Sequence, residues 1–317
     1  MASPVLATVR TWYYLHRGAG LQGFNMSLDH PLTAEQVAKF FRQGFLVIET
    51  PQILGQELEW CRQILMRLIE QGVGRKEGRN FDLAARSGGE DRPSPQMVRP
   101  SLYAVELAGL SCRSTALSVA KQLLGPDASF ALDNSILKPR RNGGPTPWHQ
   151  DEAYNDPRHY QEQVSFWIAI TDSTADNGAM AYIPGSHLLG ILPHRLNGGS
   201  AQANSIECYA GFDPSAAEIC PVPAGTMIIH HGRTLHGASG NKSGRSRLAY
   251  ILIYKTPPRP RTELGEFPWN EQVGKSSRME RRRWLLRGGI FPEMLRFLRS
   301  DRDAHRHIID QIRRRLF

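Results

Sequence analysis

Cysteine is scarce in this chain. Only four occur among its 317 residues, Cys61, Cys112, Cys208 and Cys220, and no two of them form a C-x-x-C pair. Their scatter excludes a disulfide-dense secreted scaffold and a zinc site built from paired thiolates. We expect reduced and mostly buried thiols, which are typical of a cytoplasmic protein.

Long apolar runs are also lacking. The longest obvious one, Val164 to Ile170, is far shorter than the roughly 18 residues that a membrane-spanning helix needs. The N-terminus carries Arg10 and His16 among its aromatic residues and lacks an apolar core followed by a small-residue cleavage site. This pattern argues against a secretory signal. The sequence therefore predicts neither a membrane span nor a secreted protein.

Acidic residues are fewer than basic ones, and the excess of positive charge is local. The formal net charge is +9, and residues 278–317 hold 12 arginines against five acidic residues. Basic tails of this kind can bind nucleic acid or anionic membranes. Amphipathic helices with a solvated arginine face are the alternative, and they are favoured by the spacing of Trp284, Leu285, Ile290, Leu295, Leu298, Ile308, Ile309 and Ile312. We therefore predict a basic helical appendage over residues 259–317 and disfavour nucleic acid as a partner.

The first part of the chain has helical periodicity. Thr33 and Gln36 have the spacing of a capping box before a helix that ends near Gly44. Further helices are predicted over Leu54–Gln71 and Leu110–Leu124. Between residues 72 and 100 the apolar periodicity disappears, and Gly, Arg, Ser and Pro dominate. A polar connection of this length is typical of a lid or an ordered active-site loop.

From residue 129 onward, short alternating segments separated by Gly, Pro and Asn predict strands. The predicted strands are Phe130–Lys138, Val164–Thr171, Ala179–Ile183, Ser205–Ala210, Thr226–His230 and Arg247–Lys255. Segments of this number and length suit a mainly β fold with flanking helices around a double-stranded β-helix of the jelly-roll or cupin-like type. A hydrophobic content of 40% is enough for the core of one such domain.

One tripeptide has the spacing of a metal site. His149-Gln150-Asp151 places an imidazole and a carboxylate at i and i+2, which project from the same side of an extended strand. With one distant histidine they form a facial triad, which holds Fe(II) in non-haem oxygenases and leaves three positions open for co-substrate and O₂. An isolated His-x-Asp is more often a surface turn. The distal histidine decides between these interpretations.

The distal ligand has three candidates, His230, His231 and His236. Alternation along a strand lets only one of the adjacent pair face inwards. We select His236 because Arg247 follows it by 11 residues at the head of an apolar strand, and His231 is the reserve. A guanidinium at that place can form a bidentate pair with the remote carboxylate of 2-oxoglutarate.

These motifs resemble the phytanoyl-CoA dioxygenase-like family of Fe(II)/2-oxoglutarate oxygenases, from about residue 32 to residue 254. Beside the metal motif and Arg247, the resemblance rests on the segments Leu32–Val37, Gly44–Ile48, Asp176–Met180, Ile183–His187 and Ala224–Thr226. One position departs from the pattern. The family frequently has Ser two residues after the distal histidine, where this chain has Ala238 followed by Ser239. A second hydrogen bond to the co-substrate is therefore left without an assigned donor.

The resemblance implies a catalytic domain over residues 32–258, after an N-terminal extension over residues 1–31 with no fold of its own. Met26 is a candidate start within that extension. It also implies that Fe(II) is held by His149, Asp151 and His236, that O₂ is used, and that 2-oxoglutarate chelates the iron through its keto acid end. Arg247 would then neutralise the far carboxylate of the co-substrate.

Two further residues are candidates for the co-substrate pocket. Trp167 follows His149 by 18 residues, where the family often has a Trp beside the co-substrate, and plain core packing is the alternative. Asn134 shares strand parity with Lys138, so both are predicted to point into the barrel. We predict a co-substrate contact for Asn134. Lys138 is alternatively a snorkelling side chain at the end of the strand.

Three other residues are less specific. Tyr154 and Arg141 flank the metal motif closely enough to contact substrate, and the alternative for each is ordinary loop surface. His187 ends a Pro-Gly-Ser-His turn, and its imidazole is predicted to be hydrogen-bonded for structural reasons rather than to bind metal.

The resemblance thus implies hydroxylation of an unactivated C–H bond in a small molecule, with release of succinate and CO₂. Family substrates include acyl-CoA esters, amino-acid-like solutes and natural products of secondary metabolism, and no residue selects among them. Related halogenases have a small residue in place of Asp151, so a carboxylate favours hydroxylation, or desaturation or cyclisation by the same oxidant. The alternatives are a non-catalytic cupin-like binding protein and an oxygenase acting on a macromolecule through the basic C-terminal region. A homo-oligomer is compatible with each of these interpretations.

Overall fold

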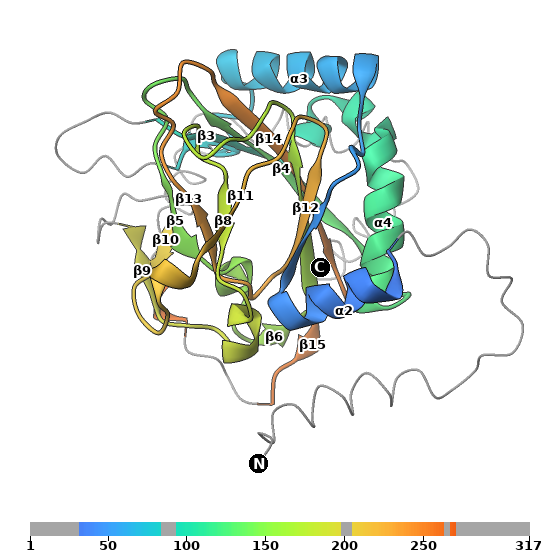
Figure 1. Cartoon of the computed structure of the whole chain (residues 1–317), viewed down its shortest axis with the longest axis vertical. Coiled ribbons are helices and arrows are strands. Elements are labelled where there is room, and N and C mark those ends of the chain that lie inside the picture. Colours follow the sequence, from blue (N-terminus) through green and yellow to red (C-terminus); the bar gives the residue numbers. More distant parts are fainter. Residues whose placement is uncertain (1–31, 84–92, 198–204, 263–266, 271–317) are drawn as a thin grey trace, which may run out of the picture.

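The computed structural model describes residues 32–83, 93–197, 205–262 and 267–270. In these ranges two β-sheets pack against each other, and three helices lie outside the larger sheet (Figure 1). The predicted N-terminal extension and the predicted tail helices lie outside the described residues. No helix in the part that is described is long and apolar enough to cross a membrane.

The larger sheet has seven strands in the order β1-β12-β7-β14-β4-β3-β2, and the smaller has four in the order β11-β8-β13-β5. The seven are β1 Phe45–Ile48, β2 Asn80–Asp82, β3 Pro95–Val98, β4 Ser129–Lys138, β7 Gln163–Ala169, β12 Met227–His231 and β14 Arg247–Lys255. The four are β5 Thr146–His149, β8 Met180–Tyr182, β11 Glu218–Cys220 and β13 His236–Ala238. Two strand pairs complete the fold: β9 His194–Leu196 with β10 Ile206–Cys208, and β6 His159–Tyr160 with β15 Arg259–Pro260. The predicted double-stranded β-helix is confirmed.

Alternation along the central strands creates two separate cores. On β7, Trp167 and Ala169 face the smaller sheet and pack in one apolar cluster with its Met180 and Tyr182. Phe166, like the other residues of opposite parity, packs with the helices on the outer face. A strand buried on both faces reads as an almost continuous apolar run, which is why β7 and β14 are so easily located in the sequence.

Three helices cover the outer face of the larger sheet: α2 Ala34–Gln43, α3 Gly55–Glu70 and α4 Ser111–Leu124. The predicted capping box is present, since the Thr33 side chain accepts from the Gln36 amide and the Gln36 side chain accepts from the Thr33 amide. Gly44 ends α2 in the left-handed conformation, with φ +85°. The four cysteines are buried and free, as predicted.

Gly44 joins α2 to the loop that carries the distal histidine. Its carbonyl accepts from the Thr234 hydroxyl at 2.6 Å, and an added Cβ would lie 2.5 Å from that hydroxyl and 2.4 Å from Nδ1 of His187. Gly44→Ala is therefore expected to lower the free energy of unfolding by about 2–5 kcal/mol, from left-handed strain and overpacking together. Urea denaturation measures the loss. Gly55→Ala is the matched control, because Gly55 has φ +55° with nothing within 4 Å of its Cβ position. An equal loss in both variants would contradict this account.

The expectation of a lid or an ordered active-site loop over residues 72–100 is borne out in part, because Phe81, Leu83, Gln96 and Val98 line the cavity described below, but the segment is not a loop throughout. The segment contains β2 and β3, which add two strands to the larger sheet through the pairing of β3 with β4. These strands have three and four residues, too few for alternation to be visible in the sequence.

The described part of the predicted C-terminal appendage packs on the turn that follows β5. Trp269 lies in an apolar cluster with Ala153, and its indole Nε1 donates to the Ala153 carbonyl at 2.9 Å. Arg261 donates to Glu152 at 2.8 Å. Both contacts support the short turn that follows His149.

Candidate active site

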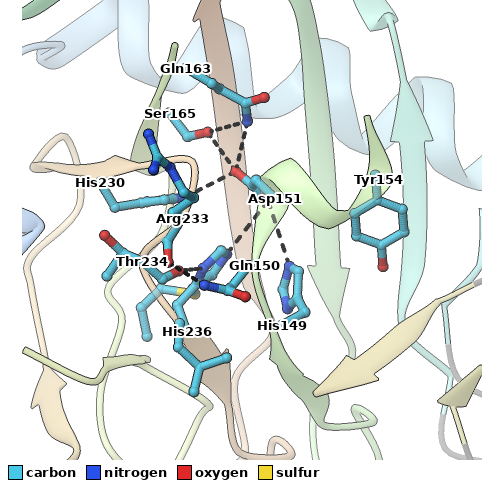
Figure 2. A network of polar contacts seen from close by, with 12 residues as sticks. His149, Gln150, Asp151, Tyr154, Gln163, Ser165, His230, Arg233, Thr234 and His236 are labelled. Carbon is cyan, nitrogen blue, oxygen red and sulfur yellow. Dashed lines mark hydrogen bonds and ion pairs between the residues drawn. The ribbon is translucent and has the colours of Figure 1, made fainter. Parts of the chain in front are cut away.

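Three side chains predicted as metal ligands converge between the two sheets (Figure 2). His149 ends β5 and His236 begins β13, and the two residues are paired in register. The Nε2 atoms of both imidazoles lie 3.7 Å from Oδ1 of Asp151. One ligand atom from each of the three residues lies within 4.8 Å of the others, so a single metal ion can reach all three.

The local conformation of the motif differs from the expected extended strand. β5 ends at His149, and Asp151 opens a 3-10 turn over Asp151–Tyr154. Gln150 between them is fully buried, and its side chain donates to the carbonyls of Gly190 at 2.8 Å and Arg233 at 2.7 Å. The middle residue of the motif therefore anchors the turn that carries the carboxylate.

Backbone carbonyls orient both imidazoles. Nδ1 of His149 lies 2.9 Å from the Pro147 carbonyl, and Nδ1 of His236 lies 2.9 Å from the Thr234 carbonyl. A carbonyl only accepts, so each Nδ1 carries the proton and each Nε2 keeps a free lone pair toward Asp151. Burial lowers the pKa of both histidines, which favours the neutral form that binds a metal.

The other oxygen of the Asp151 carboxylate is held by three side chains from the larger sheet. Ser165 donates to Oδ2 at 2.6 Å and Gln163 at 3.2 Å, and Nε2 of His230 lies 3.3 Å away. Burial would raise the pKa of Asp151, but the hydrogen bond with His230 opposes burial, and the pKa lies well below its ordinary value. Asp151 is therefore a carboxylate with one oxygen fixed and the other facing the imidazoles.

Ser165 and Gln163 were missed by the sequence reasoning, and His230 was considered only as a distal metal ligand. The available signal was strand parity, because Ser165 and Gln163 have the same parity on β7 as the inward-facing Trp167. His231, the reserve ligand, faces the other way, and its Nε2 lies 2.9 Å from Glu162. His187 hydrogen-bonds the Phe41 carbonyl at 3.0 Å, in agreement with a structural role.

Arg247 is a buried cation that lies apart from the cluster of His149, Asp151 and His236. It is 1% exposed, donates to the Gly178 carbonyl at 3.2 Å and stands 5.1 Å from the centre of the Trp167 ring. Burial lowers its pKa to about 10, so the guanidinium stays charged. It forms no ion pair with a carboxylate among the described residues. Three buried atoms here have no hydrogen-bond partner in that part of the chain: Nε of Arg247, Nε1 of Trp167 and Oδ1 of Asn134.

Lys138 on β4 is the registered partner of Arg247 on β14. It is fully buried, which excludes a snorkelling side chain, and its Nζ donates to the Gly144 carbonyl at 2.5 Å. Burial and the nearby Arg247 lower the pKa of Lys138, and its side chain is not part of the cavity lining. Because an unpaired buried charge is costly, the guanidinium of Arg247 and the orphaned polar atoms beside it fit a bound carboxylate.

One cavity of about 410 Å³ connects these parts. Its walls include every predicted site residue except one: His149, Asp151, His236, Arg247, Trp167, Asn134 and Tyr154. Arg141 is exposed on the loop after β4 and lies outside this lining, so the structure does not bring it to the site. The hydroxyl of Tyr154 accepts a hydrogen bond from the Ile206 amide at 3.1 Å.

Comparisons with known proteins show which family the chain resembles. The family model described as "Phytanoyl-CoA dioxygenase (PhyH)" matches residues 40–249. A probable alpha-ketoglutarate-dependent hypophosphite dioxygenase of Stutzerimonas stutzeri is 27% identical over 70% of this chain and 78% of its own length. The ectoine dioxygenase of Halomonas elongata is 29% identical over 71% of this chain and 70% of its own. The crystal structure of EvdO2 from Micromonospora carbonacea var. aurantiaca complexed with 2-oxoglutarate has a TM-score of 0.62 at 29% identity, over 77% of this chain and 99% of that one.

Proposed function

The chain belongs to the phytanoyl-CoA dioxygenase (PhyH) family and is a 2-oxoglutarate-dependent non-haem iron oxygenase, and on that premise we propose that it hydroxylates an unactivated C–H bond of a small molecule. One observation carries the proposal: the same cavity is lined by the His149/Asp151/His236 cluster and by Arg247. Arg247 is buried and has no carboxylate partner among the described residues, so it is available to bind a carboxylate of the co-substrate.

We assign roles to the residues as follows. His149, Asp151 and His236 hold Fe(II), which supplies the oxidising chemistry with O₂ and 2-oxoglutarate. Arg247 binds the remote carboxylate of 2-oxoglutarate, with Trp167 and Asn134 beside it. His230, Ser165 and Gln163 fix the orientation of Asp151, in the way that outer residues commonly fix metal ligands.

A small-molecule substrate is supported by the dimensions of the cavity. Its volume of about 410 Å³ lies at the lower end of the range for ligand pockets. Two similar proteins are named for small molecules, ectoine and hypophosphite. The protein's contribution to specificity would be to place one C–H bond next to the iron and to keep water out.

The carboxylate of Asp151 leads to a prediction about the reaction type. A ligand at this place occupies the position that a halide would need, so the product should carry a hydroxyl group even when chloride or bromide is added. Mass spectrometry of the product and of succinate should give one succinate per oxidised molecule. Asp151→Gly should lose hydroxylation, because two imidazoles hold iron more weakly. A halogenated product from the unmodified enzyme would overturn the proposal.

A further inference from the structure

The inward face of β14 carries a cation at each end. Arg247 begins the strand and Lys255 ends it, and both line the cavity together with Ile251 and Ile253, which have the same parity. At about 3.3 Å per residue, the two cations lie roughly 26 Å apart along the strand. Only Arg247 has a role in the proposed function.

The candidate metal site lies nearer to Lys255 than to Arg247. Oδ2 of Asp151 is bonded by Ser165 and Gln163, and these two residues are the registered partners of Ile253 and Lys255 on β7. In the proposed function the co-substrate would occupy the part of the cavity between the metal site and Arg247. Lys255 therefore lines the remaining part of the cavity, which is available to the substrate.

The ammonium of Lys255 is not neutralised by the residues around it. Its direct partner is a neutral oxygen, Oδ1 of Asn155 at 2.7 Å, and it forms no ion pair with a carboxylate among the residues that the structure describes. Glu152 is already paired with Arg261 at 2.8 Å and Arg233 at 3.0 Å. Burial lowers the pKa of Lys255, and the charges of Asp151 and Glu152 oppose that change.

A second hydrogen-bond donor lies beside this ammonium. Nδ2 of Asn155 is buried and has no partner in the described part of the chain, and Asn155 also lines the cavity. The same amide thus accepts from Lys255 through its oxygen and keeps a free N–H group. Apolar side chains complete this lining, among them Phe81, Leu83, Leu132 and Ile206.

We propose that Lys255 and Asn155 bind an oxyanion group of the substrate, a carboxylate or a phosphate, while the apolar lining receives its hydrocarbon part. This inference rests on the proposed function, because it names the substrate class of the same site. A charged donor and an amide N–H that converge on one oxyanion form short, strong hydrogen bonds. The substrate would be a small acid oriented by its charge, with Arg247 reserved for the co-substrate.

The first test compares matched pairs of compounds. Small acids that stimulate succinate formation from 2-oxoglutarate are assayed beside the corresponding neutral amides or alcohols. We expect acids to be preferred. Lys255→Met should raise the KM for acids roughly ten- to a hundredfold and leave the KM for the neutral counterparts unchanged. Lys255→Arg should retain the preference, and Lys121→Met, on the exposed face of α4, is the control.

Asn155→Asp is a more specific test because it leaves the lysine in place. The new carboxylate would form an ion pair with Lys255, so the preference for acids should disappear. Asn155→Ala removes only the amide and should weaken the preference in part. Neutral or cationic stimulators, or equal effects of Lys255→Met on acids and their neutral counterparts, would overturn the inference. An enzyme that turns over no 2-oxoglutarate at all would instead overturn the proposed function.

A binding measurement decides the matter without turnover. The protein is labelled with ¹³C at the lysine ε-carbons, loaded with zinc in place of iron, and saturated with 2-oxoglutarate. Inorganic phosphate and acetate, titrated separately, distinguish the two oxyanions. The Lys255 signal, identified by its absence in Lys255→Met, should shift saturably with at least one of them, and that shift should be lost in Asn155→Asp. A signal that responds to neither anion would contradict the inference.

Discussion

Replacing His236 with alanine is expected to bring 2-oxoglutarate turnover below detection while the fold is retained. The variant removes one of two neutral imidazoles whose Nε2 atoms face Oδ1 of Asp151 at 3.7 Å. The remaining pair, His149 and Asp151, would hold Fe(II) too weakly for catalysis. The rate of succinate formation and the bound iron per protein measure the effect, and circular dichroism checks the fold.

His231→Ala is the matched control. His231 lies in the same strand segment, but it faces Glu162 and lines no part of the cavity, so its variant should keep turnover within a few-fold of the original. An active His236→Ala together with an inactive His231→Ala would show that the distal ligand is misassigned.

Arg247→Gln is expected to raise the KM for 2-oxoglutarate by one to two orders of magnitude. The guanidinium is buried and has no carboxylate partner in the described part of the chain. Its ion pair with the co-substrate should therefore contribute its full free energy to co-substrate binding. The loss of a hydrogen bond to a charged group costs about 1.5–3 kcal/mol, which corresponds to this change in affinity. Steady-state kinetics at varied 2-oxoglutarate concentration measures it.

Arg245→Gln is the control for charge alone. Arg245 is exposed and precedes β14, so it does not share the strand face of Arg247. Its variant should leave the KM unchanged. A normal KM in Arg247→Gln would remove the guanidinium from the co-substrate site.

The sequence was sufficient for the elements with strong local signals. The capping box at Thr33 and the long apolar strand from Arg247 satisfy rules that depend only on neighbouring residues, and both were located to within a residue. The His-x-Asp motif together with His236 was enough to predict a metal site, since their spacing is specific once Arg247 follows. The assignment of each residue to a role remains a prediction.

The remaining parts of the site depend on pairing between distant strands. Ser165 and His230 reach Asp151 because β12 and β7 are adjacent in register, and a sequence does not display register. Lys255 was placed at the end of a predicted strand, but its position beside Asn155 follows from the turn after Asp151. Arg141 had only proximity along the chain in its favour, and proximity along the chain did not bring it to the cavity.

The central claim, that His149, Asp151 and His236 hold the iron that couples 2-oxoglutarate to substrate oxidation, is tested most directly by removing and restoring the metal. Enzyme stripped with a chelator is assayed for succinate formation from 2-oxoglutarate, before and after Fe(II) is added without oxygen and the reaction is started with O₂. We predict no succinate from the stripped enzyme, recovery with Fe(II), and no recovery with Zn(II) bound at the same residues. Full activity of the metal-free enzyme, or substrate oxidation with Fe(II) and O₂ in the absence of 2-oxoglutarate, would contradict the account.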